Sequence, residues 1–121
     1  MPLFLYEREA FSDFIAILKE HVSSKAVVHC FTGNQPELKV YLEMGFYFGI
    51  TRWICDERRG KHLRGLVRII LPNWLMIETD APFLPLRDLN EKPTDGWNEP
   101  AFLQHPANRS KLYRKTCGRD R

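Results

Sequence analysis

Two acidic side chains, Glu78 and Asp80, stand at the end of the apolar segment LMIETDAPFL, which covers residues 75–84. Residues two apart in an extended chain point to the same side, so these carboxylates are expected to project together while Thr79 points away. Two negative charges this close repel each other unless a positive group lies between them. A divalent cation, a basic side chain or solvent would each meet this need. The pair therefore indicates a charged site without defining its ligand.

The elements that must position these carboxylates follow a regular order. Short, bulky and nearly continuous apolar segments are typical of strands covered on both faces, and four are predicted, over 3–6, 26–30, 45–51 and 74–79. Helical patterns separate them, over 7–22, 36–45 and 57–71. Pro36 suits a first helical position, Gly45 is a natural left-handed stop, and Pro72 ends the third helix. This alternation predicts a parallel α/β fold.

The spacing of the strand ends indicates the fold class. The ends, taken at Tyr6, His29, Thr51 and Asp80, follow one another at intervals of 23, 22 and 29 residues. About 25 residues per unit gives roughly 200 residues over eight units, the lower end of (β/α)8 barrels. This chain holds four such units, which predicts the C-terminal half of a (β/α)8 TIM barrel, with a small open doubly wound sheet as the alternative. A half-barrel leaves sheet edges uncovered, and self-association through those edges is expected.

Composition predicts one soluble domain of ordinary size, with 121 residues, 44% of them hydrophobic and 27% charged. No apolar run approaches the roughly 20 residues that cross a bilayer, and the first residues do not resemble a signal peptide. The expected location is therefore cytoplasmic, without a membrane partner. Cys30, Cys55 and Cys117 are odd in number and share no CxxC spacing, so neither a disulfide framework nor a structural zinc site is expected.

Basic charge is concentrated at the C-terminus. Residues 109–121 hold six basic side chains and one acidic one, a local net charge of +5 against +3 for the whole chain. Such a segment would contact nucleic acid phosphates, and a solvated terminus is the alternative. Because Pro106 comes early and no helical pattern follows, we expect a domain over 1–105 and a divergent basic tail over 106–121.

Functional side chains of α/β proteins gather at the carboxyl ends of the strands. His29 and Asp80 both stand at such ends and offer the nitrogen and oxygen donors that bind catalytic divalent metals. A hydrogen-bonded structural histidine and a turn-forming aspartate are the alternative interpretation. Their corresponding positions in neighbouring units favour a metal site.

Several motifs together resemble the C-terminal half of the TatD family of metal-dependent hydrolases. They are VVHCFTG (27–33), GFYFGIT (45–51), WICDERRGKHLR (53–64), IETDAPFL (77–84), RDL (87–89) and NEPAFL (98–103), and PLFLYEREA (2–10) is similar to the preceding strand of the family. The resemblance covers residues 2 to about 105. It implies a (β/α)8 barrel of the amidohydrolase type, a divalent metal centre holding Mg, Mn or Zn, and hydrolysis of phosphodiester bonds in DNA, as a deoxyribonuclease.

The resemblance also implies roles for individual residues. His29 and Asp80 match metal ligands, and Asp80 is the implied catalytic residue, because a carboxylate there accepts a proton from water whose pKa the metal lowers toward ~7. Glu78 is implied to shape the site beside these ligands. Arg8, Asn98 and Glu99 match other family positions, beside the ligands or near the substrate.

This chain also departs from the family pattern. Tyr6 stands where the family has a histidine, and a protonated phenol is a poor metal ligand. Arg52 replaces a glycine, which puts a cation at the mouth of the site. Family members also supply an HxH pair from their first strand and a glutamate from their fourth strand, and this chain contains neither strand. The family's last amphipathic helix is also replaced after His105.

These departures leave two metal ligands, whereas a catalytic metal normally keeps three protein ligands and a water. The interpretation is therefore a truncated hydrolase with impaired or no activity unless another chain supplies the missing half. A non-catalytic remnant acting as an interaction module through its sheet edges is the alternative. An independent α/β binding domain with a charged pocket is a third hypothesis.

Aromatic and basic residues near the expected site suggest contacts with DNA. Phe31, Phe83 and Trp97 would stack on bases, and the basic residues within 52–64 would contact phosphates. Core or loop anchoring is the alternative role for these aromatic rings.

Overall fold

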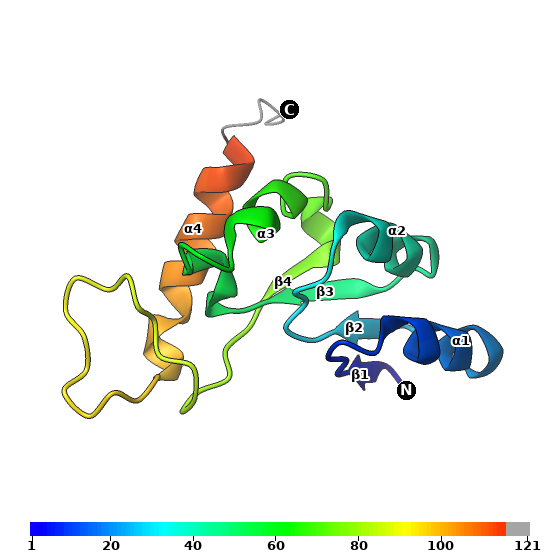
Figure 1. Ribbon diagram of the computed structural model, residues 1–121, viewed down its shortest axis with the longest axis horizontal. Coiled ribbons are helices and arrows are strands. Elements are labelled where there is room, and N and C mark those ends of the chain that lie inside the picture. Colours follow the sequence, from blue (N-terminus) through cyan, green and yellow to red (C-terminus); the bar gives the residue numbers. More distant parts are fainter. Residues whose placement is uncertain (116–121) are drawn as a thin grey trace.

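Four strands form one parallel sheet in the order β1-β2-β3-β4 (Figure 1). The computed structural model describes residues 1–115, and its strands are β1 (Leu3–Leu5), β2 (Ala26–Val28), β3 (Tyr47–Ile50) and β4 (Leu75–Ile77). Phe4 pairs with Val27 across β1 and β2, and Gly49 pairs with Met76 across β3 and β4. The parallel α/β arrangement predicted from the sequence is confirmed, and each strand lies inside its predicted range.

Helices connect the strands and complete the chain. They are α1 (Phe11–His21), α2 (Gln35–Glu43), α3 (Lys61–Leu66) and α4 (Gln104–Lys115), with short 3-10 helices η1 (Arg52–Cys55), η2 (Pro72–Trp74) and η3 (Pro100–Leu103). Helix α2 begins at a capping box, in which the Asn34 side chain accepts from the Glu37 N–H at 3.0 Å and the Glu37 carboxylate accepts from the Asn34 N–H at 2.9 Å. None of the helices described for residues 1–115 has the length and apolarity of a membrane span.

Helix α3 is shorter than the 57–71 range that the apolar pattern predicted. Asp56 Oδ1 accepts hydrogen bonds from the N–H groups of Arg58, at 2.9 Å, and Arg59, at 2.8 Å. These bonds hold residues 57–60 in a turn and delay the helix to Lys61. The same bonds, that of Arg59 first, keep the pKa of Asp56 below its usual range. A side chain that competes for backbone N–H groups therefore sets the start of α3.

The expectation that residues after His105 would not form a helix is wrong for the described part of that segment. Helix α4 runs from Gln104 to Lys115 and packs against η1 and α3. Pro106 lies in its first turn, where the missing N–H of proline costs no intrahelical bond. The domain boundary at residue 105 stays a prediction, and residues 116–121 of the predicted tail lie outside the described chain.

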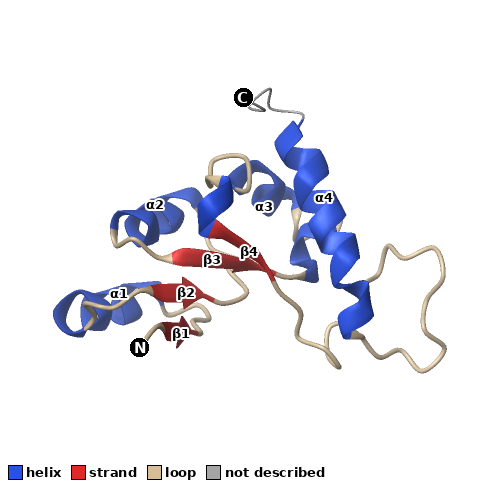
Figure 2. Ribbon diagram, turned by 180° about the vertical axis from the view of Figure 1, so that it is seen from behind, coloured by secondary structure: helices blue, strands red, loops and turns tan. Residues whose placement is uncertain are grey.

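One face of the sheet is covered and the other is not. Helices α2 and α3 lie on the same side of β3 and β4 (Figure 2), where Tyr41 of α2, Phe48 of β3 and Ile70 are fully buried. On the opposite face, Phe4 is 65% exposed and Met76 is 44% exposed. The continuous apolar pattern predicted cover on both faces. Within residues 1–115, helices cover only one of them.

Gly60 is expected to tolerate no side chain. A Cβ there would overlap the Trp53 carbonyl oxygen and lie 2.6 Å from that of Asp56, and both are backbone atoms that cannot rotate away. We expect Gly60→Ala to lower the free energy of unfolding by about 1–3 kcal/mol, measured by urea denaturation. Gly65→Ala is the matched control in α3, because a Cβ there meets nothing within 4 Å and alanine favours the helix by about 1 kcal/mol. Equal stability of the two variants would contradict this packing.

Candidate metal and nucleic-acid site

The imidazole of His29 lies between two carboxylates. Its Nδ1 is 2.7 Å from Glu78 Oε2, and its Nε2 is 2.8 Å from Asp80 Oδ1. The three side chains are between 10% and 24% exposed, so the cluster is largely shielded but reachable from solvent. The residues that the sequence placed at two strand ends therefore meet at one point.

Backbone geometry after β2 aims His29 at this point. The His29 N–H donates to the Leu5 carbonyl at 2.8 Å, which continues the pairing with β1. The next residue, Cys30, turns into the left-handed region with φ 50°, a conformation that costs energy for a residue other than glycine. The Cys30 N–H donates to Glu78 Oε2 at 3.1 Å, so this carboxylate accepts from the backbone as well as from the histidine.

The Cys30 side chain is fixed at the same edge of the sheet. Its Sγ lies 3.2 Å from Thr51 Oγ1, at the end of β3. Burial raises the pKa of the Cys30 thiol, and the nearby carboxylates of Asp80 and Glu78 raise it further. Cys30 is therefore a protonated thiol at neutral pH.

Gly49 makes room for the Glu78 carboxylate. Gly49 lies in β3, between β2, which leads to His29, and β4, which leads to Glu78. A Cβ on Gly49 would overlap the Glu78 carboxylate. The bare backbone at this position lets Glu78 cross the middle strand and reach the histidine.

The loop after β4 is braced around Asp80. The Asn98 side chain donates to Thr79 Oγ1 at 2.9 Å, and the Asn98 N–H donates to the Pro82 carbonyl at 2.9 Å. Asn98 is 6% exposed, and the Phe83 N–H donates to the Asp80 carbonyl at 2.8 Å. These bonds hold the segment that carries Asp80, and they give Asn98 a structural place beside the cluster.

Of three further candidates from the sequence, Tyr6 contacts the cluster, whereas Arg8 and Glu99 are exposed side chains. The Tyr6 ring stacks on His29, with ring centroids 5.6 Å apart and an interplanar angle of 28°, and the residue is 65% exposed. Arg8 and Glu99 are exposed, and neither makes an ion pair within the described residues. The structure thus unites His29, Glu78, Asp80, Tyr6 and Asn98 but not Arg8 or Glu99.

Arg52 is buried rather than free at the mouth of the site. It is 8% exposed, its guanidinium lies 4.5 Å from the centre of the Trp53 ring, and its Nε has no hydrogen-bond partner in the described chain. Burial lowers the pKa of Arg52, and the positive charge of Arg87 lowers it further. Arg52 lines a small hollow together with Glu78 and Asp80, so the predicted cation is next to the cluster.

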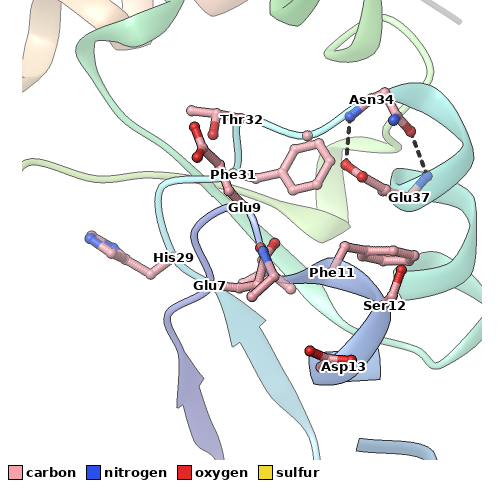
Figure 3. Close-up of a pocket in the computed structure, with 13 residues that line it drawn as sticks. Glu7, Glu9, Phe11, Ser12, Asp13, His29, Phe31, Thr32, Asn34 and Glu37 are labelled. Atoms are coloured by element: carbon pink, nitrogen blue, oxygen red, sulfur yellow. Dashed lines mark hydrogen bonds between the residues drawn. The ribbon is translucent and has the colours of Figure 1, made fainter. Parts of the chain in front are cut away.

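A cavity of about 570 Å³ opens beside His29, between the start of α1 and the start of α2 (Figure 3). Four acidic residues line it, namely Glu7, Glu9, Asp13 and Glu37. The His29 ring points away from the other lining side chains (Figure 3). Clustered carboxylates repel a phosphate chain, so this cavity does not suit a nucleic acid backbone.

Two of the three aromatic residues suggested for base stacking are available on the surface. Phe83 is 65% exposed and Trp97 is 50% exposed, and their ring centroids are 6.4 Å apart. Both belong to the loop after β4, which also carries Asp80. Phe31 is 5% exposed and packs edge-on against Phe48, so it belongs to the core, which was the alternative interpretation.

Sequence reasoning missed two features that the fold brings together. Gly49 carried no signal beyond being a glycine inside a strand, a position where close approach of another group is a common reason. Cys55, Asp88 and His105 come from separate segments, and potential ligand atoms of the three lie within 4.8 Å of one another. No local spacing motif connects them.

Comparison with known proteins identifies the family. The sequence matches the family model described as TatD related DNase over residues 1–114. It is 47% identical over 116 residues to the 3'-5' ssDNA/RNA exonuclease TatD of Rahnella sp. (strain Y9602), and 49% identical over 116 residues to that of Edwardsiella piscicida. Each match covers 94% of this chain but only 44% or 45% of the relative. The chain therefore spans less than half the length of these relatives.

Solved structures share the fold. A TatD family hydrolase from Entamoeba histolytica matches with a TM-score of 0.83 at 25% identity, covering 95% of this chain and 44% of that chain. A TatD homologue from Escherichia coli K12 matches in fold with a TM-score of 0.78 at 24% identity, covering 93% of this chain and 42% of that chain. The four parallel strands and their helices are thus part of a TIM-barrel hydrolase fold, and the chain belongs to the TatD related DNase family.

Proposed function

We propose that this chain carries part of the metal centre of a hydrolase that cleaves phosphodiester bonds in DNA. The observation that carries the proposal is the position of His29 between Glu78 and Asp80, at 2.7 and 2.8 Å. Relatives named 3'-5' ssDNA/RNA exonuclease support a nucleic acid substrate. His29 and Asp80 are the proposed ligands, and Asp80 is the proposed catalytic group.

The residues fit a divalent cation of the Mg, Mn or Zn type. Two ligands on adjacent positions of an octahedral ion, each about 2.1 Å from it, lie roughly 3 Å apart, and on a tetrahedral zinc ion they lie roughly 3.4 Å apart. The observed 2.8 Å between His29 Nε2 and Asp80 Oδ1 is close to the octahedral separation. A carboxylate on the second ring nitrogen is the usual support of a metal-bound histidine, and Glu78 supplies it.

Each residue has its own task in this proposal. Glu78 accepts from Nδ1–H of His29, and Nε2 would become an electron-pair donor when a cation replaces its direct contact with Asp80. Asp80 offers a carboxylate that binds the cation and accepts a proton from water. Bound in this position, the cation would polarise a phosphoryl oxygen and lower the pKa of water toward ~7.

The ligand set of this chain is incomplete for catalysis. Tyr6 stacks on His29 but offers a phenol, a poor metal ligand, so two protein ligands remain where a catalytic metal normally has three. We therefore expect weak metal binding and impaired or absent nuclease activity for this chain alone. Cytoplasmic location stays a prediction.

A second candidate function is an interaction module. It is favoured by the uncovered face of the sheet, where Phe4 and Met76 are exposed among the strands. Exposed apolar surface and open sheet edges favour association with another chain, including a second copy. In this reading the protein associates without hydrolysing DNA.

Removing both proposed ligands should abolish binding of Mn²⁺. We expect isothermal titration to show one weak Mn²⁺ site in the unaltered protein and none in the His29→Ala, Asp80→Ala double variant, because both donor atoms are lost and Mn²⁺ disfavours thiolate ligands elsewhere in the chain. The matched control is Glu20→Ala, His21→Ala, which removes an exposed carboxylate–histidine pair 3.7 Å apart. Binding that survives loss of His29 and Asp80, or disappears in the control, would refute the assignment.

Gly49→Ala should damage the site without removing any ligand. The added Cβ forces the Glu78 carboxylate away from Nδ1 of His29, and loss of such support typically weakens metal binding by roughly 10–100-fold. Glu78→Gln should have a similar effect. Mn²⁺ titration measures both, and urea denaturation should show little loss of stability in Gly49→Ala because the displaced group is a flexible side-chain end. Unchanged Mn²⁺ affinity in both variants would mean that Glu78 does not support the ligand.

The surface pair Phe83 and Trp97 should contribute to binding of single-stranded DNA. We expect Phe83→Ala, Trp97→Ala to weaken binding of a fluorescent oligonucleotide by about 1–3 kcal/mol for each base that stacks. Leu112→Ala is the control, since it removes a large apolar side chain that is also 50% exposed, on α4. An equal loss in both variants would indicate general apolar contact instead of stacking.

A further inference from the structure

A second group of metal-ligand side chains lies outside the His29 cluster. Cys55 ends η1, Asp88 belongs to the loop after β4, and His105 lies in the first turn of α4. Potential ligand atoms of the three residues all lie within 4.8 Å of one another. Cys55 is 3% exposed, and the side chains of Asp88 and His105 are 17% and 28% exposed.

Two buried polar atoms of this group lack hydrogen bonds. His105 Nε2 is 3.0 Å from Asp88 Oδ2, but the contact does not have hydrogen-bond geometry. Asp88 Oδ1 is also buried and has no partner among the described residues. Buried polar atoms are rarely left unpaired, because the loss of hydration costs free energy. Asp88 Oδ1 and His105 Nε2 are therefore available to donate electron pairs to a cation at a point where three segments meet.

We propose that Cys55, Asp88 and His105 form a second cation site, which takes a divalent transition metal of the zinc type. A thiolate sulfur, an imidazole nitrogen and a carboxylate oxygen are the ligand types of tetrahedral zinc sites. Such ligands lie roughly 3.3–3.8 Å apart when they share one ion, so small side-chain rotations from separations below 4.8 Å would close the cage. Asp88 Oδ1 and His105 Nε2 are themselves buried, so a water that serves as the fourth ligand would be enclosed together with the ion.

The nearby Arg109 affects the affinity of this proposed site for a cation. Its guanidinium donates to Asp88 Oδ2 at 3.1 Å, which leaves Oδ1 for the ion. A thiolate and a carboxylate balance the charge of a divalent cation, while Arg109 adds one positive charge and weakens the site. Burial, and after it the negative charge of Asp88, raise the pKa of the Cys55 thiol to about 12. A metal that binds here must therefore displace the thiol proton.

Occupation of this site would join η1, the loop after β4 and α4. Helix α4 already packs against η1, and Arg109 ties it to Asp88. A metal held by all three segments would fix the loop that also carries Asp80 and Asn98. The site is thus structural in this proposal, and it shares no ligand with the His29 cluster.

Cobalt(II) provides a direct test, because a thiolate bound to Co²⁺ gives an intense near-ultraviolet charge-transfer band that oxygen and nitrogen ligands do not give. We expect titration of the whole chain with Co²⁺ to produce this band at one equivalent, and Zn²⁺ to remove it by displacement. Cys55→Ser should lose the band. His105→Gln, at a partly exposed position, should weaken Co²⁺ binding at least tenfold, with the fold of each variant verified by circular dichroism.

Three controls separate this site from the rest of the chain. Cys30→Ser and Cys117→Ser should keep the band, because they remove the other two thiols. His29→Ala, Asp80→Ala should also keep it, so that failure of the first metal site does not affect this result. Absence of the band in the unaltered protein, or its persistence in Cys55→Ser, would overturn the proposal and leave an Asp88–Arg109 ion pair that anchors α4.

Discussion

The pairing of His29 with Glu78 and Asp80 is the interaction on which the candidate site depends. It joins residues that follow β2 and β4, which are separated in the sheet by β3. Parallel strands bring their carboxyl ends to one edge, so residues 49 to 51 positions apart in the chain become neighbours. The carboxylate of Glu78 crosses β3 because Gly49 has no side chain to block it. The two carboxylates fix the orientation of this largely shielded imidazole, because one contacts Nδ1 and the other contacts Nε2.

The sheet supports this site with a core on one side only. Helices α2 and α3 cover the face that contains Phe48, whereas Phe4 and Met76 of the opposite face are exposed. The relatives are more than twice as long as this chain, and matching structures are TatD family hydrolases of TIM-barrel fold. In a closed barrel the inner face is filled by side chains from all eight strands. The uncovered face carries the exposed residues that favour the interaction proposal, whereas the metal-centre proposal rests on residues that follow β2 and β4.

Strand positions were predictable because a buried strand needs a short continuous run of bulky apolar residues, and each observed strand lies within such a run. Helix boundaries were less predictable from the sequence than strand positions. Asp56 holds a turn through two backbone N–H groups and shortens α3, and Pro106 fits in the first turn of α4 instead of preventing the helix. In both places a local bond or position outweighed the apolar pattern. His29, Glu78 and Asp80 could be selected from their places at strand ends, whereas Arg8 and Glu99, which matched the family pattern, are exposed and make no ion pair within the described residues.

The sequence by itself determined the alternation of strands and helices, the family, and the polar residues that follow the strands, because these depend on local apolar runs and motif letters. Tertiary structure alone decided that Glu78 and Asp80 contact opposite nitrogens of the His29 ring, and that Arg52 is buried against Trp53. It also brought together Cys55, Asp88 and His105, which no spacing rule connects. The physical reason is that contacts between distant segments depend on strand register and on which helix packs where. These are properties of the assembled sheet and not of any short stretch of the chain.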